Sequence, residues 1–363
     1  MAIDRARKNV ILLAACQALL LTGNIILIAL NGLVGFSLAG DKALATLPIT
    51  TFVIGTAIWT IPASMWMRRV GRRAGFVSGA AIGMAGAVLA TYAVYISSFW
   101  TLCTGTALMG MYSAFGQYYR FAAADVASSS FKSKAISLVM AGGIVGGVLG
   151  PESAKLTRGL LVPDFLASYA SLIGFSLLAL ILLSFIDIPP LSQEQKKEKG
   201  RPLTQILRQP IFIVAVLAST IGYGVMNLIM TATPLAMSHH HHPFNDAAFV
   251  IEWHVIGMFA PSFFTGSLIN RFGIHRVMLF GAALMAACIA IALAGIELVN
   301  FWVALVLLGV GWNFLFVGGT TLLTEAYAPS ERAKTQAAND FVVFSSVAAS
   351  SLATRRSYAR DRP

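Results

Sequence analysis

Long apolar runs separated by short polar connections set the pattern of this chain. Each run holds roughly 20 residues, the length that a helix needs to cross the ~30 Å hydrocarbon core of a bilayer. Ten runs predict membrane-spanning helices, and an eleventh, at 335–352, is interrupted by Asn339, Asp340 and a Ser-rich end. The ten runs are 10–36, 44–67, 74–96, 99–122, 135–153, 165–186, 211–237, 247–269, 277–296 and 301–323. The pattern therefore predicts an all-α membrane protein.

One polar stretch is longer than the other connections and suggests a division of the chain. Between Asp187 and Pro210 the sequence carries Pro189-Pro190 and then a run of charged and amide residues. We expect this stretch to join six helices to a second, shorter set. The predicted parts are an N-terminal transmembrane half (1–187), a cytoplasmic linker (188–210), an incomplete C-terminal transmembrane half (211–353) and a polar, basic tail (354–363).

The composition leaves too few charged residues for a water-facing surface. Of the 363 residues, 57% are hydrophobic and 11% are charged, whereas a soluble domain has about 25% charged residues. The mean hydropathy is +0.76. A bilayer removes the need for a charged shell, which supports the membrane assignment.

The basic residues fall mostly on one side of the predicted membrane. With the N-terminus inside, the inner segments hold 19 of the 26 Lys and Arg residues, the outer segments hold three, and four lie in the tail. Because cytoplasmic loops collect basic residues, we predict a multi-pass protein of the inner (plasma) membrane with a cytoplasmic N-terminus. The same distribution accounts for the net charge of +11 without a nucleic-acid partner.

Short segments of the first half recur in the second at a nearly fixed offset. Arg69-Val70-Gly71 returns as Arg271-Phe272-Gly273, 202 residues later, and Lys134 returns as Lys334. Two related halves joined by a cytoplasmic linker are typical of secondary transporters, whose substrate sites lie between the repeats at the bilayer midplane.

The loop between the second and third predicted helices resembles a signature of the major facilitator superfamily, Gly-x-x-x-Asp-Arg-x-Gly-Arg-Arg. Ser64 and Arg68 replace the Gly and the Asp of that signature, and Asn270 replaces the acid in the second copy. The resemblance implies a fold of two pseudo-symmetric six-helix halves, of which the second is incomplete because the last of the family's twelve helices is missing. It also implies an inner gate where Arg residues pair with acids. A loop that only follows the positive-inside bias is the alternative. The expected gate residues are Arg69, Gly71, Arg72, Arg73, Gly266, Arg271, Gly273, Arg276 and Asp340.

A stripe of small residues marks the fifth predicted helix. Gly142, Gly146 and Gly150 recur every four residues and precede Pro151, a spacing that permits close helix packing. The stripe resembles a signature of proton-coupled exporters, which implies an antiporter. Two features depart from that subgroup: Glu152 and its successors replace a Gly pair, and Thr106 stands where an Arg is expected.

Polar residues within predicted spans repeat at helical spacing on the helices that line the central cavity in this family. Such residues are costly in a bilayer and tend to face a cavity or a partner. Hydrogen bonding between helices is an equally supported alternative for each residue taken singly. The candidate substrate-binding residues are Gln17, Asn24, Asn31, Ser113, Gln117, Tyr118, Ser219, Tyr223, Asn227, Trp312 and Asn313.

Two further features carry titratable groups. Glu152 is the candidate coupling residue, since a buried carboxyl can take up and release a proton during transport; an ion pair with Lys155 or Arg158 is the equal alternative. His239–His242 precede the eighth predicted helix and form either a solvated turn or a sensor of metal or protons. We predict no metal and no cofactor, because no metal-ligand or nucleotide-binding motif is present.

These observations predict a secondary active transporter of a small organic solute that works by alternating access and is linked to protons, with a facilitative transporter as the alternative. The polar side chains, mainly amides, hydroxyls and aromatics, suit a neutral or amphipathic solute. The expected partners are the bilayer, the solute and protons, and the chain is expected to act as a monomer. A polytopic enzyme or receptor is a less supported alternative, because no cluster of catalytic groups is present. A truncated, non-transporting fragment is the other: after Ala353 the sequence becomes abruptly basic, and the resemblance implies a missing last helix.

Overall fold

The computed structural model of the chain describes residues 2–189, 198 and 200–360. Within these residues every regular element is a helix, which confirms the predicted all-α membrane class. Eight helices in this part of the chain are long and apolar enough to cross a membrane, or nine if one bent pair counts as a single span. Residues 190–197 and 199 of the predicted linker, and 361–363 of the predicted tail, lie outside the described residues.

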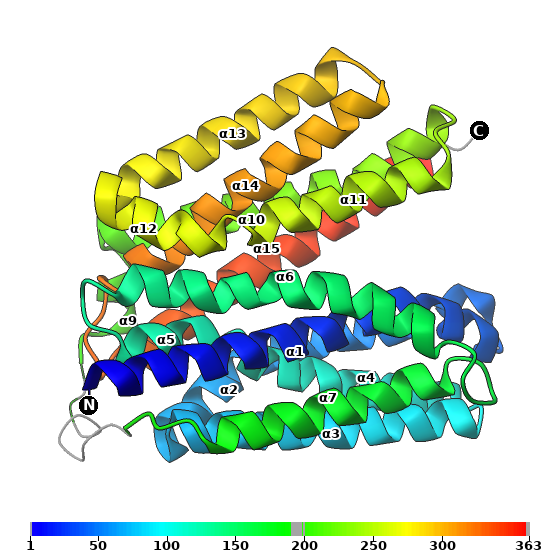
Figure 1. The fold of residues 1–363 in the computed structure, drawn as a ribbon, viewed down its shortest axis with the longest axis horizontal. Helices are drawn as coiled ribbons and strands as arrows, with labels where there is room; N and C mark the ends of the chain where they lie inside the picture. Colours follow the sequence, from blue (N-terminus) through cyan, green and yellow to red (C-terminus); the bar gives the residue numbers. More distant parts are fainter. Residues whose placement is uncertain (1, 190–197, 199, 361–363) are drawn as a thin grey trace. The chain divides into compact units, whose positions relative to one another are not determined.

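The helices pack into two compact units (Figure 1). Unit 1 holds Met1–Val126 and Gly142–Glu198, and unit 2 holds Ala127–Ala141 and Lys199–Pro363. The helix α6 (Lys132–Thr157) contributes its first part to unit 2 and the rest to unit 1. This division differs from the predicted halves by the segment 127–141, which groups with the second half.

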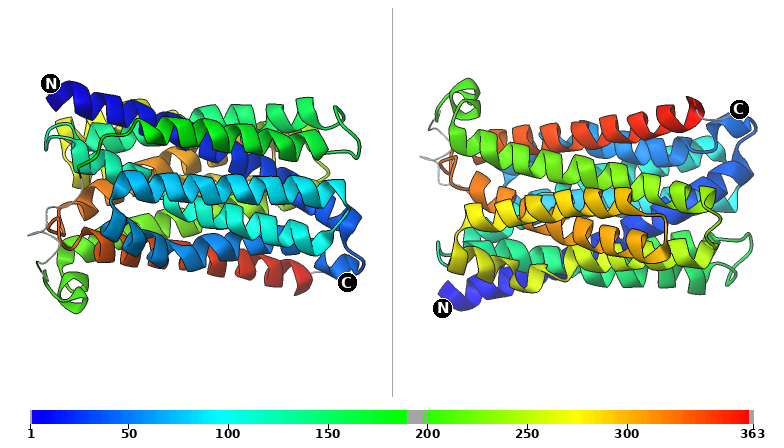
Figure 2. Two further views of the ribbon diagram at one scale, coloured as in Figure 1. Left: turned by 90° about the horizontal axis from the view of Figure 1, so that it is seen from below. Right: turned by 90° about the horizontal axis from the view of Figure 1, so that it is seen from above.

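Unit 1 is built from long helices joined by short turns. Besides α6 it contains α1 (Ala2–Leu38), η1 (Lys42–Leu44), α2 (Leu47–Val70), α3 (Arg72–Tyr95), α4 (Phe99–Gly116), α5 (Tyr119–Val126) and α7 (Leu166–Ser184). Helices α2 and α3 both pack against α4, and the three run side by side in Figure 2 (left).

Unit 2 repeats this arrangement with different helix breaks. It contains α9 (Leu203–Leu207), α10 (Pro210–His239), α11 (Phe244–Phe259), α12 (Ser262–Phe272), α13 (Ile274–Ala294), α14 (Leu298–Leu323) and α15 (Arg332–Arg360). Here α13 and α11 both pack against α14, as α3 and α2 pack against α4 in unit 1.

The structure corrects the bounds of three predicted spans. The span expected over 99–122 ends at Gly116, and the short helix α5 follows it. The span expected over 247–269 is two helices that meet at an angle of 42°. Pro261 lies at that break, and a proline has no backbone N–H to continue the hydrogen-bond ladder. The eleventh span, expected over 335–352, is helical from Arg332 to Arg360.

The predicted repeat has a matching backbone geometry. Gly71 ends α2 with φ 93° and ψ 162°, and Gly273 ends α12 with φ 89° and ψ 149°. Each glycine N–H donates to the carbonyl four residues earlier, Met67 and Ile269, at 2.9 Å. Residues that carry a Cβ rarely adopt a positive φ of this size, so glycine is favoured at both turns. The two loops are therefore built in the same way.

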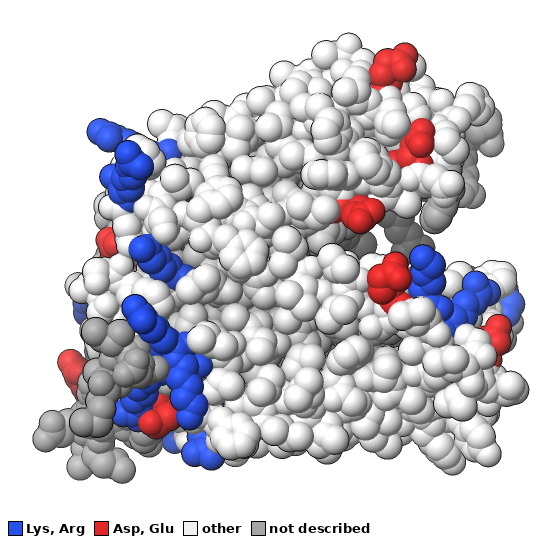
Figure 3. Space-filling model, viewed as in Figure 1, with Lys and Arg blue, Asp and Glu red and all other residues white. Residues whose placement is uncertain are grey.

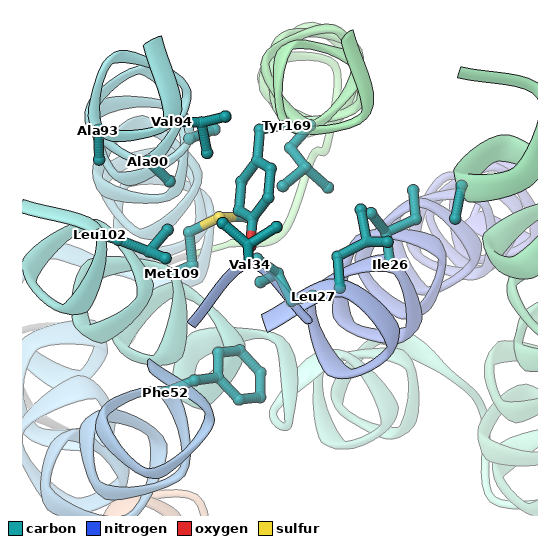
Figure 4. Packing of buried hydrophobic residues seen from close by; sticks show 14 residues of the cluster. Ile26, Leu27, Val34, Phe52, Ala90, Ala93, Val94, Leu102, Met109 and Tyr169 are labelled. Atoms are coloured by element: carbon teal, nitrogen blue, oxygen red, sulfur yellow. The ribbon is translucent and has the colours of Figure 1, made fainter. Parts of the chain in front are cut away.

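The apolar core of unit 1 lies where α1, α3, α4 and α7 meet (Figure 4). Leu27 of α1, Leu102 of α4 and Leu172 of α7 are each at most 1% exposed. Tyr169 projects into the same cluster from α7. This packing holds the helices that carry the polar candidates of unit 1.

Candidate functional site

In unit 1 the structure brings two of the candidate substrate-binding residues together. The side-chain amide of Asn24 in α1 donates to Ser113 Oγ in α4 at 3.2 Å. Gln17 lies about two turns earlier on α1 and is half-buried. The pair joins the two helices that the sequence predicts to line a cavity, and it leaves amide and hydroxyl oxygens as further acceptors.

A buried arginine at the start of α5 was not among the candidates drawn from the sequence. Arg120 is 3% exposed, and its Nη1 donates to the Gln117 side-chain oxygen at 3.2 Å. Its guanidinium also lies 4.6 Å from the ring centre of Phe121. Arg120 is one of the 19 basic residues expected in the inner segments. Its place within the apolar, aromatic run 118–124 was the signal that it is buried.

Two other candidates of unit 1 are fully enclosed. Asn31 is 1% exposed and accepts a hydrogen bond of 2.6 Å from the Tyr169 hydroxyl. Tyr118 is 0% exposed and donates to the Thr60 carbonyl at 2.7 Å. The first contact joins α7 to α1, and the second joins the turn between α4 and α5 to α2. Both therefore match the alternative of hydrogen bonds between packed segments.

In unit 2 the candidates gather around an aromatic cluster, defined here as Tyr223, Phe259, Trp312, Phe316 and Phe344. The Tyr223 ring of α10 lies edge-on to Trp312 and Phe316 of α14, with centroids 5.4 and 5.3 Å away, and to Phe344 of α15 at 5.7 Å. Trp312 and Phe316 stack with their planes 14° apart, and Phe259 meets Trp312 at 5.8 Å. Trp312 is buried, whereas Tyr223 is partly exposed. Three neighbouring rings thus hold Tyr223 in place, and part of the residue stays exposed.

The polar candidates on α10 lie one turn to either side of Tyr223. Ser219 is buried, and its Oγ is so close to Gly319 that a side chain at that glycine would meet it. Asn227 is half-buried, and its amide donates to the Val347 carbonyl at 3.5 Å. Close packing therefore surrounds Ser219, while Asn227 lies at the more open end of the row.

Asn313 follows Trp312 but points into a different environment. Its amide donates to the Met258 carbonyl at 2.7 Å and to Ser262 Oγ at 2.5 Å, and its oxygen accepts from Thr265 at 2.7 Å. These bonds fasten α14 to the break between α11 and α12. Every amide position of Asn313 contacts protein, so its contacts match the interhelical alternative.

Beside the turn between α2 and α3 of unit 1, Arg72 pairs with an acid, as the resemblance implied. Its Nη2 and Nε lie 3.1 and 3.2 Å from Asp125 Oδ2, and the two side chains are 4% and 11% exposed. Arg69 and Arg73, which flank the turn at Gly71, are exposed. The acid that Arg72 contacts is thus Asp125 of α5, whereas position 68 of the signature holds an arginine.

The second copy of the loop is held by backbone contacts. The Gly266 N–H donates to Ser137 Oγ at 3.0 Å, and a Cβ at Gly266 would lie 2.6 Å from the Lys134 Cα. Asn270 donates to the Ser130 carbonyl at 2.8 Å. Glycine at 266 thus permits the close approach of α12 to the start of α6.

Three more of the expected gate residues lie on α12, α13 and α15. The Arg271 guanidinium lies 5.2 Å from the Phe272 ring centre, and Arg276 is exposed. Asp340 is 0% exposed and accepts a hydrogen bond of 2.8 Å from Asn339. Asp340 is therefore enclosed within unit 2, whereas the two arginines lie at its surface.

A second buried acid in unit 2 was not among the sequence candidates. Glu331, between α14 and α15, is 2% exposed and accepts hydrogen bonds from Arg201 Nη2 at 2.6 Å and Nε at 2.9 Å. The backbone N–H groups of Arg201 and Ala328 also donate to this carboxylate. The Arg201 guanidinium lowers the pKa of Glu331 to about 2, and the same bond raises the pKa of Arg201. The end of the linker is thereby fixed to unit 2.

The glycine stripe of α6 packs closely, as its spacing predicted. A Cβ at Gly146 would lie 2.7 Å from Leu21 Cβ, and one at Gly150 would lie 2.8 Å from Ile25 Cβ. At Gly142 it would run into the Ala14 carbonyl oxygen. All three neighbours belong to α1, so the stripe is the contact face between α6 and α1. Pro151 follows the stripe inside α6.

The burial expected for Glu152 is not observed. Its side chain is 54% exposed, and its Oε1 lies 3.6 Å from Lys155 Nζ. Lys155 is itself 77% exposed. The ion pair with Lys155, which was the alternative for Glu152, is therefore present, and the carboxylate lies at the surface of unit 1.

The four consecutive histidines form the end of α10 and the turn after it. His239 and His240 stack edge-on with centroids 5.3 Å apart. His242 Nε2 lies 2.8 Å from the Ile296 carbonyl, and its Nδ1 lies 3.8 Å from Asp246. Within the described part of the chain, no three His, Cys, Asp or Glu side chains are placed to hold a metal ion.

Charged side chains concentrate at the ends of the helices (Figure 3). On the face shown, the larger group of Lys and Arg in each unit lies at the end that carries the α2–α3 or the α12–α13 loop, and most of the surface between the ends is uncharged apart from a few acidic patches on unit 2. This distribution is the one that a chain spanning a bilayer requires.

Known proteins resemble the chain over nearly all of its length. The model of the Major Facilitator Superfamily matches residues 11–351. The riboflavin transporter RfnT of Brucella anthropi is 44% identical over 350 residues, which cover 95% of this chain and 88% of that protein. The uncharacterised MFS-type transporter YddS of Bacillus subtilis is 30% identical over 340 residues, covering 89% of this chain and 78% of that protein.

Among solved structures, the proton:xylose symporter XylE matches with a TM-score of 0.80 at 14% identity, over 96% of this chain and 87% of that one. At this identity the likeness concerns the fold alone.

Proposed function

Because the chain belongs to the Major Facilitator Superfamily, we propose that its substrate is riboflavin or a closely related flavin. The chain is a multi-pass membrane transporter of a small molecule and not an enzyme. The substrate assignment is supported by its 44% identity to a riboflavin transporter. It also fits the solute class expected from the sequence, since riboflavin is neutral and combines a flat ring system with a hydroxylated chain.

The observation that carries this proposal is the partly exposed ring of Tyr223 in the aromatic cluster. Three rings contact Tyr223 edge-on at 5.3–5.7 Å, which fixes its plane before a ligand arrives. Flat aromatic ligands bind to such rings by stacking, with a few polar groups that set their orientation. The amide of Asn227, one turn along α10, suits the carbonyl and N–H groups at the edge of a flavin ring.

Flux of riboflavin into liposomes tests the proposal. The purified full chain, reconstituted in liposomes, should carry riboflavin saturably, and flavin fluorescence reports the uptake. Tyr223→Ala should raise the half-saturating concentration about tenfold, since an aromatic pair contributes up to roughly 1.5 kcal/mol. Tyr223→Phe should behave like the parent.

Tyr95→Ala is the matched control, because Tyr95 is 65% exposed at the end of α3. If the parent shows no saturable riboflavin flux above protein-free liposomes, the substrate proposal is wrong. Equal effects of the alanine changes at Tyr223 and Tyr95 would reject the aromatic cluster as the binding surface.

We further propose that the cycle is one of alternating access linked to protons, with Glu152 as the coupling group. Few acids lie within the predicted spans, and Glu152 follows the glycine stripe at which α6 meets α1. Glu152 forms an exposed ion pair with Lys155. This ion pair would break when the carboxylate takes up a proton.

Glu152→Gln should abolish accumulation of substrate driven by a pH gradient and leave exchange at equilibrium intact, because the amide keeps the shape but cannot titrate. Lys155→Gln is the matched control: it breaks the same ion pair and retains the carboxyl. Loss of accumulation in both variants would assign the pair a structural role. Unchanged accumulation in Glu152→Gln would reject the coupling role.

A further inference from the structure

A groove of about 460 Å³ lies within unit 1, apart from the polar candidates described above. Its lining residues come from α2, α3 and α4, with those of α4 at its floor. Trp59 and Trp66 of α2 form one wall, and Met111 and Phe115 of α4 form the floor. The two tryptophans are 39% and 46% exposed, so they border an open groove and are not core residues. Its volume falls in the range of sites for small molecules.

One end of the groove is polar and positively charged. Arg69 and Ser78 line this end, and Trp66 Nε1 donates to Ser78 Oγ at 3.0 Å. Arg68 at the end of α2 and Arg73 at the start of α3 lie beside the same turn. The end near the loop therefore attracts an anion, while the rest of the groove is apolar.

We propose that this groove binds one anionic phospholipid of the leaflet into which the α2–α3 loop projects. Its phosphate lies at Arg69 and the Trp66–Ser78 pair, and one acyl chain lies over Met111 and Phe115. Charge selects the occupant: basic pockets between membrane helices bind anionic lipid head groups, and tryptophan rings favour the level of the head groups. This site is separate from the transport site proposed above.

The second repeat provides a comparison within the same chain. At the offset of 202 residues, Arg69 corresponds to Arg271, but Ser78 corresponds to Phe280 and Trp66 to Leu268. The second copy thus keeps the cation and lacks both the hydroxyl and the indole N–H. The variant Ser78→Phe gives the groove the phenylalanine that the second repeat has at the corresponding position, 280. The variant Arg271→Gln removes the arginine that corresponds to Arg69, and this arginine does not line the groove.

Native mass spectrometry of the full chain released from nanodiscs tests the proposal. Nanodiscs of phosphatidylglycerol and phosphatidylcholine supply an anionic and a neutral lipid of the same chain length. The parent should retain one phosphatidylglycerol in preference to phosphatidylcholine. Arg69→Gln should weaken retention about fivefold, as loss of roughly 1 kcal/mol per basic residue implies. Ser78→Phe should abolish it by filling the groove, and Arg271→Gln should leave it unchanged.

Three outcomes would overturn the proposal. Equal retention of both lipids would reject selection by charge, and equal losses in Arg69→Gln and Arg271→Gln would reject the groove as the site. Loss of the retained phosphatidylglycerol in the presence of millimolar inorganic phosphate would identify free phosphate as the ligand. Quenching of tryptophan fluorescence by brominated phosphatidylglycerol gives an independent readout if Ser78→Phe fails to fold: Trp66→Phe should reduce the quenching, and an unchanged signal would contradict the site.

Discussion

At the scale of single residues, the bond between Arg201 and Glu331 gives the clearest link between charge and stability. The pKa of Glu331 is lowered from 4.5 to about 2 by the hydrogen bonds from Arg201. A lowered pKa means that the carboxylate stabilises the fold fully above pH 4.5 and loses this contribution as the pH falls towards 2. The raised pKa of Arg201 acts only at strongly alkaline pH.

Glu331→Gln should therefore lower the free energy of unfolding at neutral pH by about 1–2 kcal/mol, because Arg201 is 39% exposed and water screens part of the interaction. Thermal unfolding in detergent measures this difference. It should be constant between pH 5 and 8 and shrink as the pH falls below 4.5. Glu325→Gln is the control, since Glu325 lies on the same connection and is exposed. A stability difference that stays the same as the pH falls from 4.5 towards 2 would contradict the role of the ion pair.

At the scale of helices, the glycine stripe of α6 makes a prediction with a control in the same unit. Gly146 lies so close to α1 that a Cβ would be 2.7 Å from Leu21 Cβ, whereas a Cβ at Gly174 in α7 would meet nothing within 4 Å. Gly146→Ala should destabilise unit 1 by about 1–3 kcal/mol, the usual range for overpacking. Gly174→Ala should be neutral or stabilising, because it reduces the freedom of the unfolded chain. Melting temperatures in one detergent compare the two; equal shifts would refute close packing at the stripe.

Particular residues explain which helices the sequence predicts correctly. The apolar runs predict the long helices because an apolar run of about 20 residues is stable as a helix across a bilayer. Gly71 and Gly273 mark two helix ends because the backbone at each has a positive φ, which favours glycine. The bend at Pro261 carried a visible signal, since a proline interrupts the hydrogen-bond ladder. The break after Gly116 did not, because α5 continues the apolar run.

The candidate site was predictable only as a set of helix faces. Heptad and four-residue spacing placed Asn24, Asn31 and Tyr223 on faces but did not distinguish their surroundings. Asn31 is enclosed by Tyr169, and Tyr223 is partly open; this difference depends on partners distant in sequence. Glu331 was missed for the same reason, since its partner Arg201 is 130 residues away.

At the scale of the whole molecule, the distribution of charge predicts how the chain crosses the membrane. Nineteen of the 26 basic residues fall in segments expected on the inner side, and three fall in those expected outside. The loops that end at Gly71 and Gly273 have the same backbone geometry, and both carry arginines. We therefore expect both loops, one from each unit, on the cytoplasmic side.

Labelling of single cysteines by an impermeant maleimide tests this topology in intact cells. The native cysteines Cys16, Cys103 and Cys288 are buried, which keeps the background low. Ala74→Cys and His275→Cys, at exposed positions beside the two inner loops, should react only after the membrane is permeabilised. Leu160→Cys, in an outer connection where Leu160 is 68% exposed, should react without permeabilisation. The two loops have the same backbone geometry and both carry arginines, so Ala74→Cys and His275→Cys should be labelled to the same extent under each condition. Labelling of either cysteine in intact cells would reverse the predicted orientation of that half.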